Sequence, residues 1–206
     1  MKSGPQLEKL PHVDTRVRLY CATSNPGKLR EFRLTAGRDW ELVPLAGIPP
    51  CEETGDTFEE NAILKAVHYS RYAPGLLFAE DSGLEVNALG GAPGVRSARF
   101  GGDSASDADN NRLLMEKLRG VSDRSARYVC VIAIAEAGNV LETFRGEVAG
   151  TIVDEPRGTN GFGYDPYFYY EPLDLTFAQV AAEQKLRVSH RGRALVKMLE
   201  WLSGRK

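Results

Sequence analysis

A pair of acidic residues follows directly on an apolar segment of this sequence. Glu80 and Asp81 come after residues 76–79, Leu-Leu-Phe-Ala, which have the composition of a buried strand. An acid in this position is costly to bury unless a metal ion, a hydrogen bond or a cation compensates it. Strand ends in α/β sheets collect ligands, so Asp81 is predicted to act in a site. Successive strand residues face opposite sides, so Glu80 is not expected to point into that same site.

A second acidic group lies in CEETGDTFEEN, residues 51–61, around a predicted helix start. Carboxylate oxygens are the ligands that hard divalent cations prefer, so this segment is a candidate metal-binding region. For Glu52, Glu59 and Glu60 the simpler interpretation is a solvated helix start. Thr57 with Glu60 three residues later predicts a capping box there.

The loop TSNPGK, Thr23–Lys28, joins an apolar run to a helix-forming segment. A helix start presents unpaired backbone N–H groups and partial positive charge, and Lys28 adds a formal charge, so phosphate is a natural ligand. The loop is not a Walker A motif, because Ala22 replaces its first glycine and Leu29 its hydroxyl residue. An ordinary turn is the alternative. If a polyphosphate binds here, its metal ion must be held by other oxygen ligands.

Two further groups have the composition of a ligand site. Phe162 stands between two glycines and either presents its ring to a flat ligand or packs in the core. Lys185, His190 and Arg191 cluster before or within the start of the last helix. Helix starts favour acids, so this basic group indicates an anionic or acceptor-rich ligand, with a solvated basic face as the alternative.

The elements that must position these residues alternate between strands and helices, which predicts a mixed α/β sheet. LLFAEDSGLEV predicts a strand, an acidic break and a second strand, and a hairpin turn is expected at Gly138-Asn139. The other predicted strands are 17–22, 40–45, the two arms of the hairpin within 126–153, and an aromatic strand near 167–170; the predicted helices are 27–36, 57–72, 106–118 and 189–202.

Composition excludes several classes of protein. The 206 residues are 42% hydrophobic, which suits one domain, with or without two lobes. A net charge of −2 argues against duplex nucleic acid and anionic membranes as partners. Three cysteines without a CxxC pair argue against a disulfide framework or a zinc site and favour a reducing cytosol. Residues 1–16 lack the apolar core of a signal peptide and are interpreted as a disordered leader.

Taken in order, the segments TSNPGK, EETGDTFEENA, AEDSGLEVNALGGAPGVRSARF and GFGYDP…SHRGRAL closely resemble the inosine triphosphate pyrophosphatase, or HAM1-like, family. The resemblance covers the chain from about residue 17 to its end. It implies that residues 17–206 form a single catalytic α/β domain, with an elongated mixed sheet flanked by helices and a central cleft between two lobes. It also implies a cytoplasmic, Mg²⁺-dependent homodimer. The implied reaction converts ITP, dITP and XTP to the monophosphate and pyrophosphate, which removes deaminated purines from the nucleotide pool.

The resemblance also implies roles for particular residues. Asp81 matches the family's proton acceptor and also lies at the metal, for which Glu53 matches a ligand. The implied substrate contacts are Thr23, Ser24, Asn25, Pro26, Gly27 and Lys28 in the triphosphate loop, then Ser82, then Phe162, Gly163, Tyr164 and Asp165 near the base, and finally Lys185, His190 and Arg191.

The sequence departs from the family pattern at two places. Glu80 stands where many bacterial members have Asp, so a metal-supporting role for residue 80 is not carried over. Asp174 and Leu175 replace a Gly and a Lys in a surface loop or dimer surface. Two other functions stay open: a Maf-like pyrophosphatase that acts on modified pyrimidine nucleotides, and a purine nucleotide sensor without catalysis.

Overall fold

The computed structural model describes residues 17–23, 25–36 and 40–205, and these form a seven-stranded mixed sheet flanked by helices. The strand order is β2-β1-β3-β4-β5-β6-β7, with β1 parallel to β2 and β3 and all other neighbours antiparallel. The predicted leader, residues 1–16, lies outside the described residues. The strands are β1 (Val17–Cys21), β2 (Trp40–Pro44), β3 (Leu77–Val86), β4 (Ser125–Glu136), β5 (Asn139–Ile152), β6 (Phe168–Tyr170) and β7 (Leu175–Thr176), and the α-helices are α1 (Pro26–Ala36), α2 (Phe58–Ser70), α3 (Asp107–Lys117), α4 (Ala182–Val188) and α5 (His190–Ser203).

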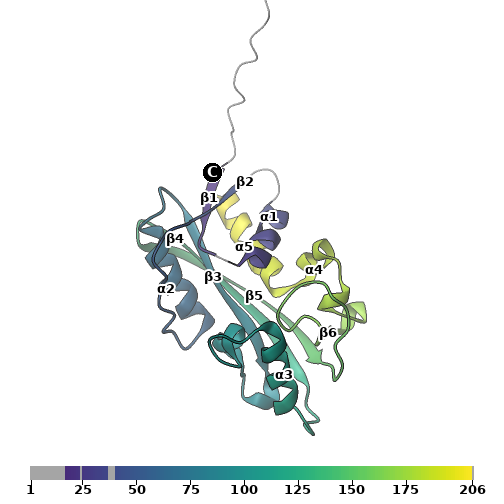
Figure 1. Ribbon diagram of the computed structural model, residues 1–206. Coiled ribbons are helices and arrows are strands. Elements are labelled where there is room, and N and C mark those ends of the chain that lie inside the picture. Colours follow the sequence, from purple (N-terminus) through teal and green to yellow (C-terminus); the bar gives the residue numbers. More distant parts are fainter. Residues whose placement is uncertain (1–16, 24, 37–39, 206) are drawn as a thin grey trace, which may run out of the picture.

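Helices cover both faces of the sheet at the end where β1 and β2 lie (Figure 1). On one face, α1 and α5 bury Phe32 and Met198 against Phe78 of β3. On the other face, α2 packs its apolar stripe against Leu77 and Ala79 of the same strand. This alternation along β3 gives the two faces separate cores and decides which way each later residue of the strand points.

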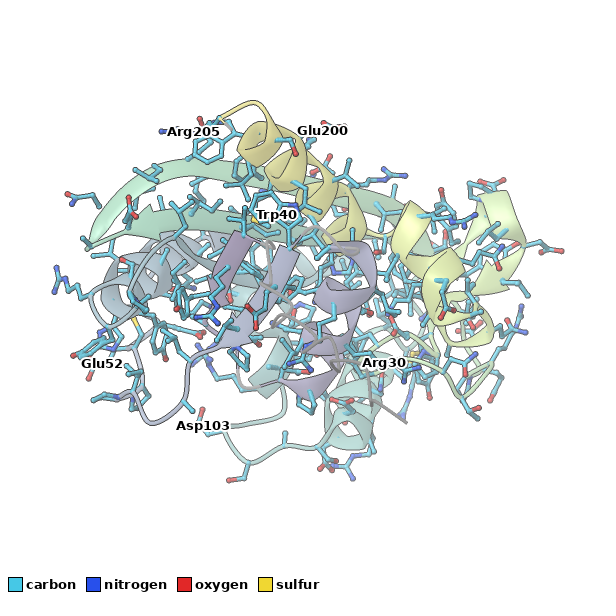
Figure 2. All side chains as sticks on the ribbon, turned by 90° about the horizontal axis from the view of Figure 1, so that it is seen from above. Arg30, Trp40, Glu52, Asp103, Glu200 and Arg205 are labelled. Carbon is cyan, nitrogen blue, oxygen red and sulfur yellow. The ribbon has the colours of Figure 1, made fainter. Side chains whose placement is uncertain are left out.

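A second lobe is built on the far ends of β3, β4 and β5, where α3 and β6 lie in Figure 1. Its core includes Leu84, Leu114, Phe168 and Phe177. The predicted two-lobed arrangement is therefore observed, and the long central strands run through both lobes. Outside the cores, the labelled Glu52, Asp103, Glu200 and Arg205 lie at the periphery, as Figure 2 shows.

Strand β3 differs from the prediction, because Leu77–Val86 is one continuous strand without an acidic break. Glu80 pairs with Ile132 and Asp81 with Val131 in the antiparallel ladder with β4. The prediction was wrong because each carboxylate finds a cation on its own side of the sheet, which compensates its burial.

Smaller differences concern turns and one helix. The β4–β5 turn is at Ala137-Gly138, one residue earlier than expected, with φ of 49° and 85° at these two residues. Helix α4 was not predicted at all. The capping box of α2 is confirmed: the Glu60 N–H donates to Thr57 Oγ1 at 3.1 Å, and Glu60 Oε2 accepts from the Thr57 N–H at 3.0 Å. None of the helices in the described part of the chain is long and apolar enough to cross a membrane.

Candidate active site

The loop after β1 leads into the start of α1, as predicted. Asn25 begins the helix: its carbonyl accepts from the Leu29 N–H at 3.0 Å and its Oδ1 accepts from the Lys28 N–H at 3.1 Å. Thr23 Oγ1 in turn accepts from the Asn25 N–H at 3.2 Å, and Pro26 is the first helical residue. The loop therefore presents a helix N-terminus, which favours an anion. Ser24 lies outside the described residues.

Lys28 forms an ion pair with the buried carboxylate of Glu80. Burial alone would raise the pKa of Glu80, but the Lys28 ammonium and the Arg191 guanidinium together hold it well below its usual range. Glu80 therefore stays ionised and holds Lys28 at the loop. This gives residue 80 a partner that the sequence did not indicate.

Asp81 points to the opposite face of β3, toward α2, as the strand alternation predicts. Its Oδ1 accepts from Lys65 Nζ at 2.7 Å, and its Oδ2 accepts from Asn61 Nδ2 at 3.4 Å. Glu53 reaches the same ammonium at 3.2 Å. Burial raises the pKa of Asp81, although the Lys65 charge opposes this shift. Burial would lower the pKa of Lys65, but Asp81 and Glu80 raise it, so the amine stays charged.

Asn61 and Lys65 were not predicted as site residues, although the pattern of α2 contains a signal for both. The buried face of this helix includes Phe58, Ala62 and Ala66. Asn61 and Lys65 fall on the same stripe and are themselves buried. A polar side chain at a core position of an amphipathic helix is costly unless it has a partner, so it indicates a site.

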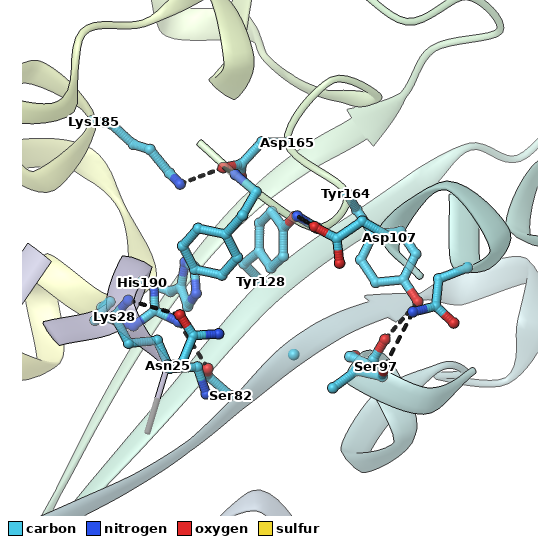
Figure 3. Close-up of a pocket in the computed structure, with 16 residues that line it drawn as sticks. Asn25, Lys28, Ser82, Ser97, Asp107, Tyr128, Tyr164, Asp165, Lys185 and His190 are labelled. Carbon is cyan, nitrogen blue, oxygen red and sulfur yellow. Dashed lines mark hydrogen bonds and ion pairs between the residues drawn. The ribbon is translucent and has the colours of Figure 1, made fainter. Parts of the chain in front are cut away.

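A group of basic residues forms one wall of a cavity between the lobes (Figure 3). Arg191 donates to Ser82 Oγ at 3.0 Å and pairs with Glu31 of α1. Lys185, on α4, donates to Glu31 Oε1 at 3.2 Å and to Asp165 Oδ2 at 2.5 Å. Burial would raise the pKa of Glu31, but Arg191 and Lys185 lower it, so one buried carboxylate holds both cations.

The predicted segment from Phe162 to Asp165 forms the opposite wall. The Phe162 ring lies over Lys185 Nζ, with 5.2 Å between the nitrogen and the ring centroid. The Phe162 N–H donates to Asp165 Oδ2 at 3.0 Å, and Tyr164 Oη donates to the Ser97 carbonyl at 2.8 Å. Burial raises the pKa of Asp165, against the opposing effect of Lys185. Phe162 is only partly buried, so the ligand-facing interpretation of its ring fits better than a core role.

Two nitrogens at the back of this cavity are buried and have no hydrogen-bond partner among the described residues: His190 Nδ1 and Arg191 Nε. The His190 ring stacks on Tyr128, with centroids 4.6 Å apart and planes 9° apart. Burial and the nearby Arg191 and Lys185 charges hold the pKa of His190 well below its usual range, so the imidazole is neutral. Buried polar atoms without partners are rare and indicate a missing ligand.

A second cavity lies beside the first, against α2 and the loop after β2. It is lined by Thr23, Glu53, Lys65 and Glu80. Asn25 and Lys28 line both cavities. The loop at the start of α1 therefore lies between the first cavity, which contains buried hydrogen-bond donors, and the two carboxylates that pair with Lys65. Lys28 lines both cavities, Glu53 lines the second and Arg191 the first, while Asp81 is buried beside Lys65.

The donor set at Lys65 is compatible with a hard divalent cation. Glu53 and Asp81 come from different elements and bring carboxylate oxygens to one shared positive charge. No cluster of three or more His, Cys, Asp or Glu side chains that could hold a metal ion occurs among the residues described. Mg²⁺ commonly takes one or two carboxylates together with substrate phosphates, so two protein ligands suffice.

Comparisons with known proteins agree with this geometry. The chain matches the Ham1 family over residues 19–201. It is 53% identical over 199 residues to a dITP/XTP pyrophosphatase of Acidobacterium capsulatum, which covers 90% of this chain and 98% of that one. A dITP/XTP pyrophosphatase of an Exiguobacterium species is 48% identical, with 88% and 95% covered.

Solved structures show the same fold. The Ham1 protein of Staphylococcus aureus superposes with a TM-score of 0.83 at 41% identity, and the match covers 92% of this chain and 100% of that one. A HAM1 protein of Coxiella burnetii gives a TM-score of 0.83 at 39% identity, with 91% and 99% covered. From its motifs, its fold and these matches, the chain belongs to the Ham1 family.

Proposed function

We propose that this protein hydrolyses the deaminated purine nucleotides ITP, dITP and XTP to the monophosphate and pyrophosphate. The observation that carries the proposal is a pair of buried nitrogens without a hydrogen bond to any described residue, His190 Nδ1 and Arg191 Nε, beside a cavity that shares Lys28 with a carboxylate-lined cavity. A purine in the first cavity would direct its triphosphate past Lys28 toward the second cavity, where Glu53 lies beside the Lys65 that pairs with Asp81. The names of the two bacterial relatives support the same substrates.

Base selection follows from donors and acceptors. Hypoxanthine and xanthine carry a 6-oxo acceptor, which satisfies a donor on Arg191. Adenine carries a 6-amino donor, which would leave the buried guanidinium N–H unpaired. Loss of hydrogen bonds to buried groups discriminates by roughly 10⁴-fold or more. The Phe162 ring adds stacking, which strengthens binding without much preference among bases.

For the reaction, Asp81 takes the proton of the water that attacks the α-phosphorus. Lys65 keeps this carboxylate ionised despite its burial, since a positive charge at 2.7 Å favours the charged form. Lys28 exchanges Glu80 for the phosphate oxygens and, with the loop amides, stabilises the leaving pyrophosphate. Glu53 and Asp81 would hold Mg²⁺, which supplies charge neutralisation at the phosphate oxygens when bound.

The resemblance also supports assembly as a homodimer and a cytoplasmic location, and both stay proposals. A Maf-like preference for pyrimidines is less favoured, because the Phe162 ring and the His190 and Arg191 side chains that line the cavity favour a purine. A sensor without catalysis has no need for the buried Asp81 beside Lys65.

A panel of nucleoside triphosphates tests the proposal. Pyrophosphate release from ITP, dITP, XTP, dUTP and ATP is measured with and without Mg²⁺. We expect ITP, dITP and XTP to be hydrolysed in the presence of Mg²⁺ and ATP to be nearly inert. Preference for dUTP would favour the pyrimidine enzyme, and tight ITP binding without turnover would favour the sensor.

The Asp81→Asn variant tests the catalytic role separately. Asparagine keeps the shape but cannot accept the proton, so kcat should fall by about 10²–10⁴-fold, the usual contribution of a general base. Asp103→Asn, at an exposed position in the loop before α3, is the matched control and should keep its activity. Substantial turnover by Asp81→Asn would remove this residue from the chemistry.

A further inference from the structure

The turn that carries Phe162 is not fixed by its own backbone preferences. Gly161 and Gly163 flank the aromatic residue with φ of +76° and +62°, a region that glycine enters without steric cost. A ring between two such glycines can adopt many orientations. Its observed position therefore depends on side-chain contacts: Asp165 holds the Phe162 N–H within the turn, and other elements supply the rest.

Helix α3, in the second lobe, contacts both backbone polar groups of Gly163. The Gly163 N–H donates to Asp107 Oδ2 at 2.6 Å. The Gly163 carbonyl accepts from Asn111 Nδ2 at 2.9 Å. The two side chains lie one turn apart on α3 and come more than fifty residues before the turn in sequence. Figure 3 shows Asp107 on the side of the cavity away from His190 and Lys28.

The Phe162 ring itself reaches across to the other lobe. Its centroid is 5.5 Å from the Arg191 guanidinium carbon and 5.2 Å from Lys185 Nζ. It also lies against the start of α1, since a Cβ built on Gly27 would be 3.0 Å from Phe162 Cδ1. The ring thus contacts α1, α4 and α5, which line the phosphate and base pockets, while α3 holds the backbone of the next residue, Gly163.

We propose that Asp107 and Asn111 are positioning residues that hold the Phe162 ring as the stacking surface for the purine. The proposal rests on the proposed function, because it assigns to the ring the base of that substrate. Asn111 does not line the first cavity, and although Asp107 does, its observed contact is with the Gly163 N–H. Both side chains act through the backbone of Gly163. The affinity for the base therefore depends on the contact between α3 and the 162–165 segment.

The charge of Asp107 makes its bond the stronger of the two. A carboxylate that accepts from a backbone N–H forms a charge-assisted hydrogen bond, which is about twice as strong as a neutral one. Without it the turn is expected to sample other orientations, so the ring stacks on the base for a smaller fraction of the time. Stacking contributes on the order of a tenfold or larger factor in affinity, so Asp107→Ala should raise the KM for ITP by about three- to tenfold.

The experiment compares Asp107→Ala, Asn111→Leu and Phe162→Ala with the unmodified protein. For each, KM and kcat for ITP are measured together with the inhibition constant of pyrophosphate, which occupies only the phosphate side. We expect KM to rise in all three variants while the pyrophosphate constant stays within about twofold. Glu116→Gln is the matched control on α3, because it removes a negative charge at an exposed position without a contact to the turn.

A double-mutant cycle decides whether the effect passes through the ring. If Asp107 acts through Phe162, adding Asp107→Ala to Phe162→Ala leaves KM unchanged, because the ring is already absent. Multiplicative effects of the two changes would overturn the proposal. So would an equal loss of ITP and pyrophosphate binding, which would indicate general damage to the fold. Asn111→Leu repeats the cycle with a neutral residue if Asp107→Ala proves unstable.

These outcomes differ from a failure of the proposed function. If the unmodified protein does not hydrolyse ITP, the function is wrong. If it does, and Asp107→Ala and Asn111→Leu both retain the KM of the unmodified protein, only the positioning role is wrong.

Discussion

Replacing Glu31 with glutamine tests whether one buried carboxylate organises the basic wall of the cavity. Glu31 pairs with Lys185 at 3.2 Å through Oε1 and with Arg191 through Oε2. The side chains of Lys185 and Arg191 are 5% and 3% exposed, so water cannot replace the lost charge. Glutamine preserves the size of the side chain. Among the described residues, Lys185 then keeps only its ion pair with Asp165, and Arg191 keeps only that with the more distant Glu80 at 4.0 Å.

The size of the effect follows from this burial. Removing one partner of a buried ion pair costs about 3–5 kcal/mol in the free energy of unfolding. The amide oxygen of glutamine still accepts one hydrogen bond, so we expect about 3 kcal/mol. For a domain of this size each kcal/mol lowers the Tm by about 2–4 °C, which gives a decrease of about 6–12 °C. The KM for ITP should rise as well, because Arg191 loses its alignment.

Thermal and urea unfolding measure this loss, and Glu41→Gln is the control. Glu41 also pairs with an arginine, Arg18, at 2.8 Å, but the side chains of Arg18 and Glu41 are 66% and 31% exposed. Exposed pairs contribute only about 0–1 kcal/mol. If both variants lose the same stability, burial does not decide the strength of the Glu31 contacts and the reasoning is refuted.

Two further predictions concern pH and packing. The folded pKa of His190 lies well below its usual value, so below about pH 6.5 the unfolded chain binds one more proton than the folded chain. Stability should therefore fall as the pH drops from about 6.5 to 5, by up to about 1.4 kcal/mol per pH unit, and His190→Gln should flatten this slope in urea titrations. Parallel slopes for the two proteins would contradict the neutral buried imidazole. Separately, a Cβ at Gly146 would lie 2.2 Å from the His190 carbonyl oxygen and 2.5 Å from the Ala194 nitrogen. Gly146→Ala should cost about 1–3 kcal/mol in unfolding free energy, whereas Gly75→Ala, which meets only Tyr20 at 4.0 Å, should not. Equal stability of these two alanine variants would contradict the close approach of α5 to β5.

The sequence predicts those parts of the fold that local chemistry determines. The capping box at Thr57 and the helix start after Asn25 are short-range patterns, and both are observed. The direction of Asp81, opposite to that of Glu80, follows from strand alternation alone. Such features depend on neighbours within a few residues, so they can be read without knowing the tertiary structure.

The missed residues depend on contacts far apart in the chain. Glu31 looks like an ordinary charged residue of a surface helix, and it is buried only because α4 and α5 pack on α1. Its partner Arg191 lies 160 positions away. The acidic break in β3 was predicted because two adjacent carboxylates resemble a loop, whereas Lys28 and Lys65 make an uninterrupted strand possible. Neither cation adjoins the strand in sequence.

The uninterrupted course of β3 ties the two sides of the site to a single pairing register. Glu80 faces Lys28 and Asp81 faces Lys65 because they are consecutive residues of one strand in register with Ile132 and Val131. A slip or insertion of one residue within Leu77–Val86 would turn each carboxylate to the wrong lysine and expose every apolar neighbour to the opposite core. Changes in length are therefore expected in the loops outside this strand, because the register of the strand fixes which lysine each carboxylate contacts.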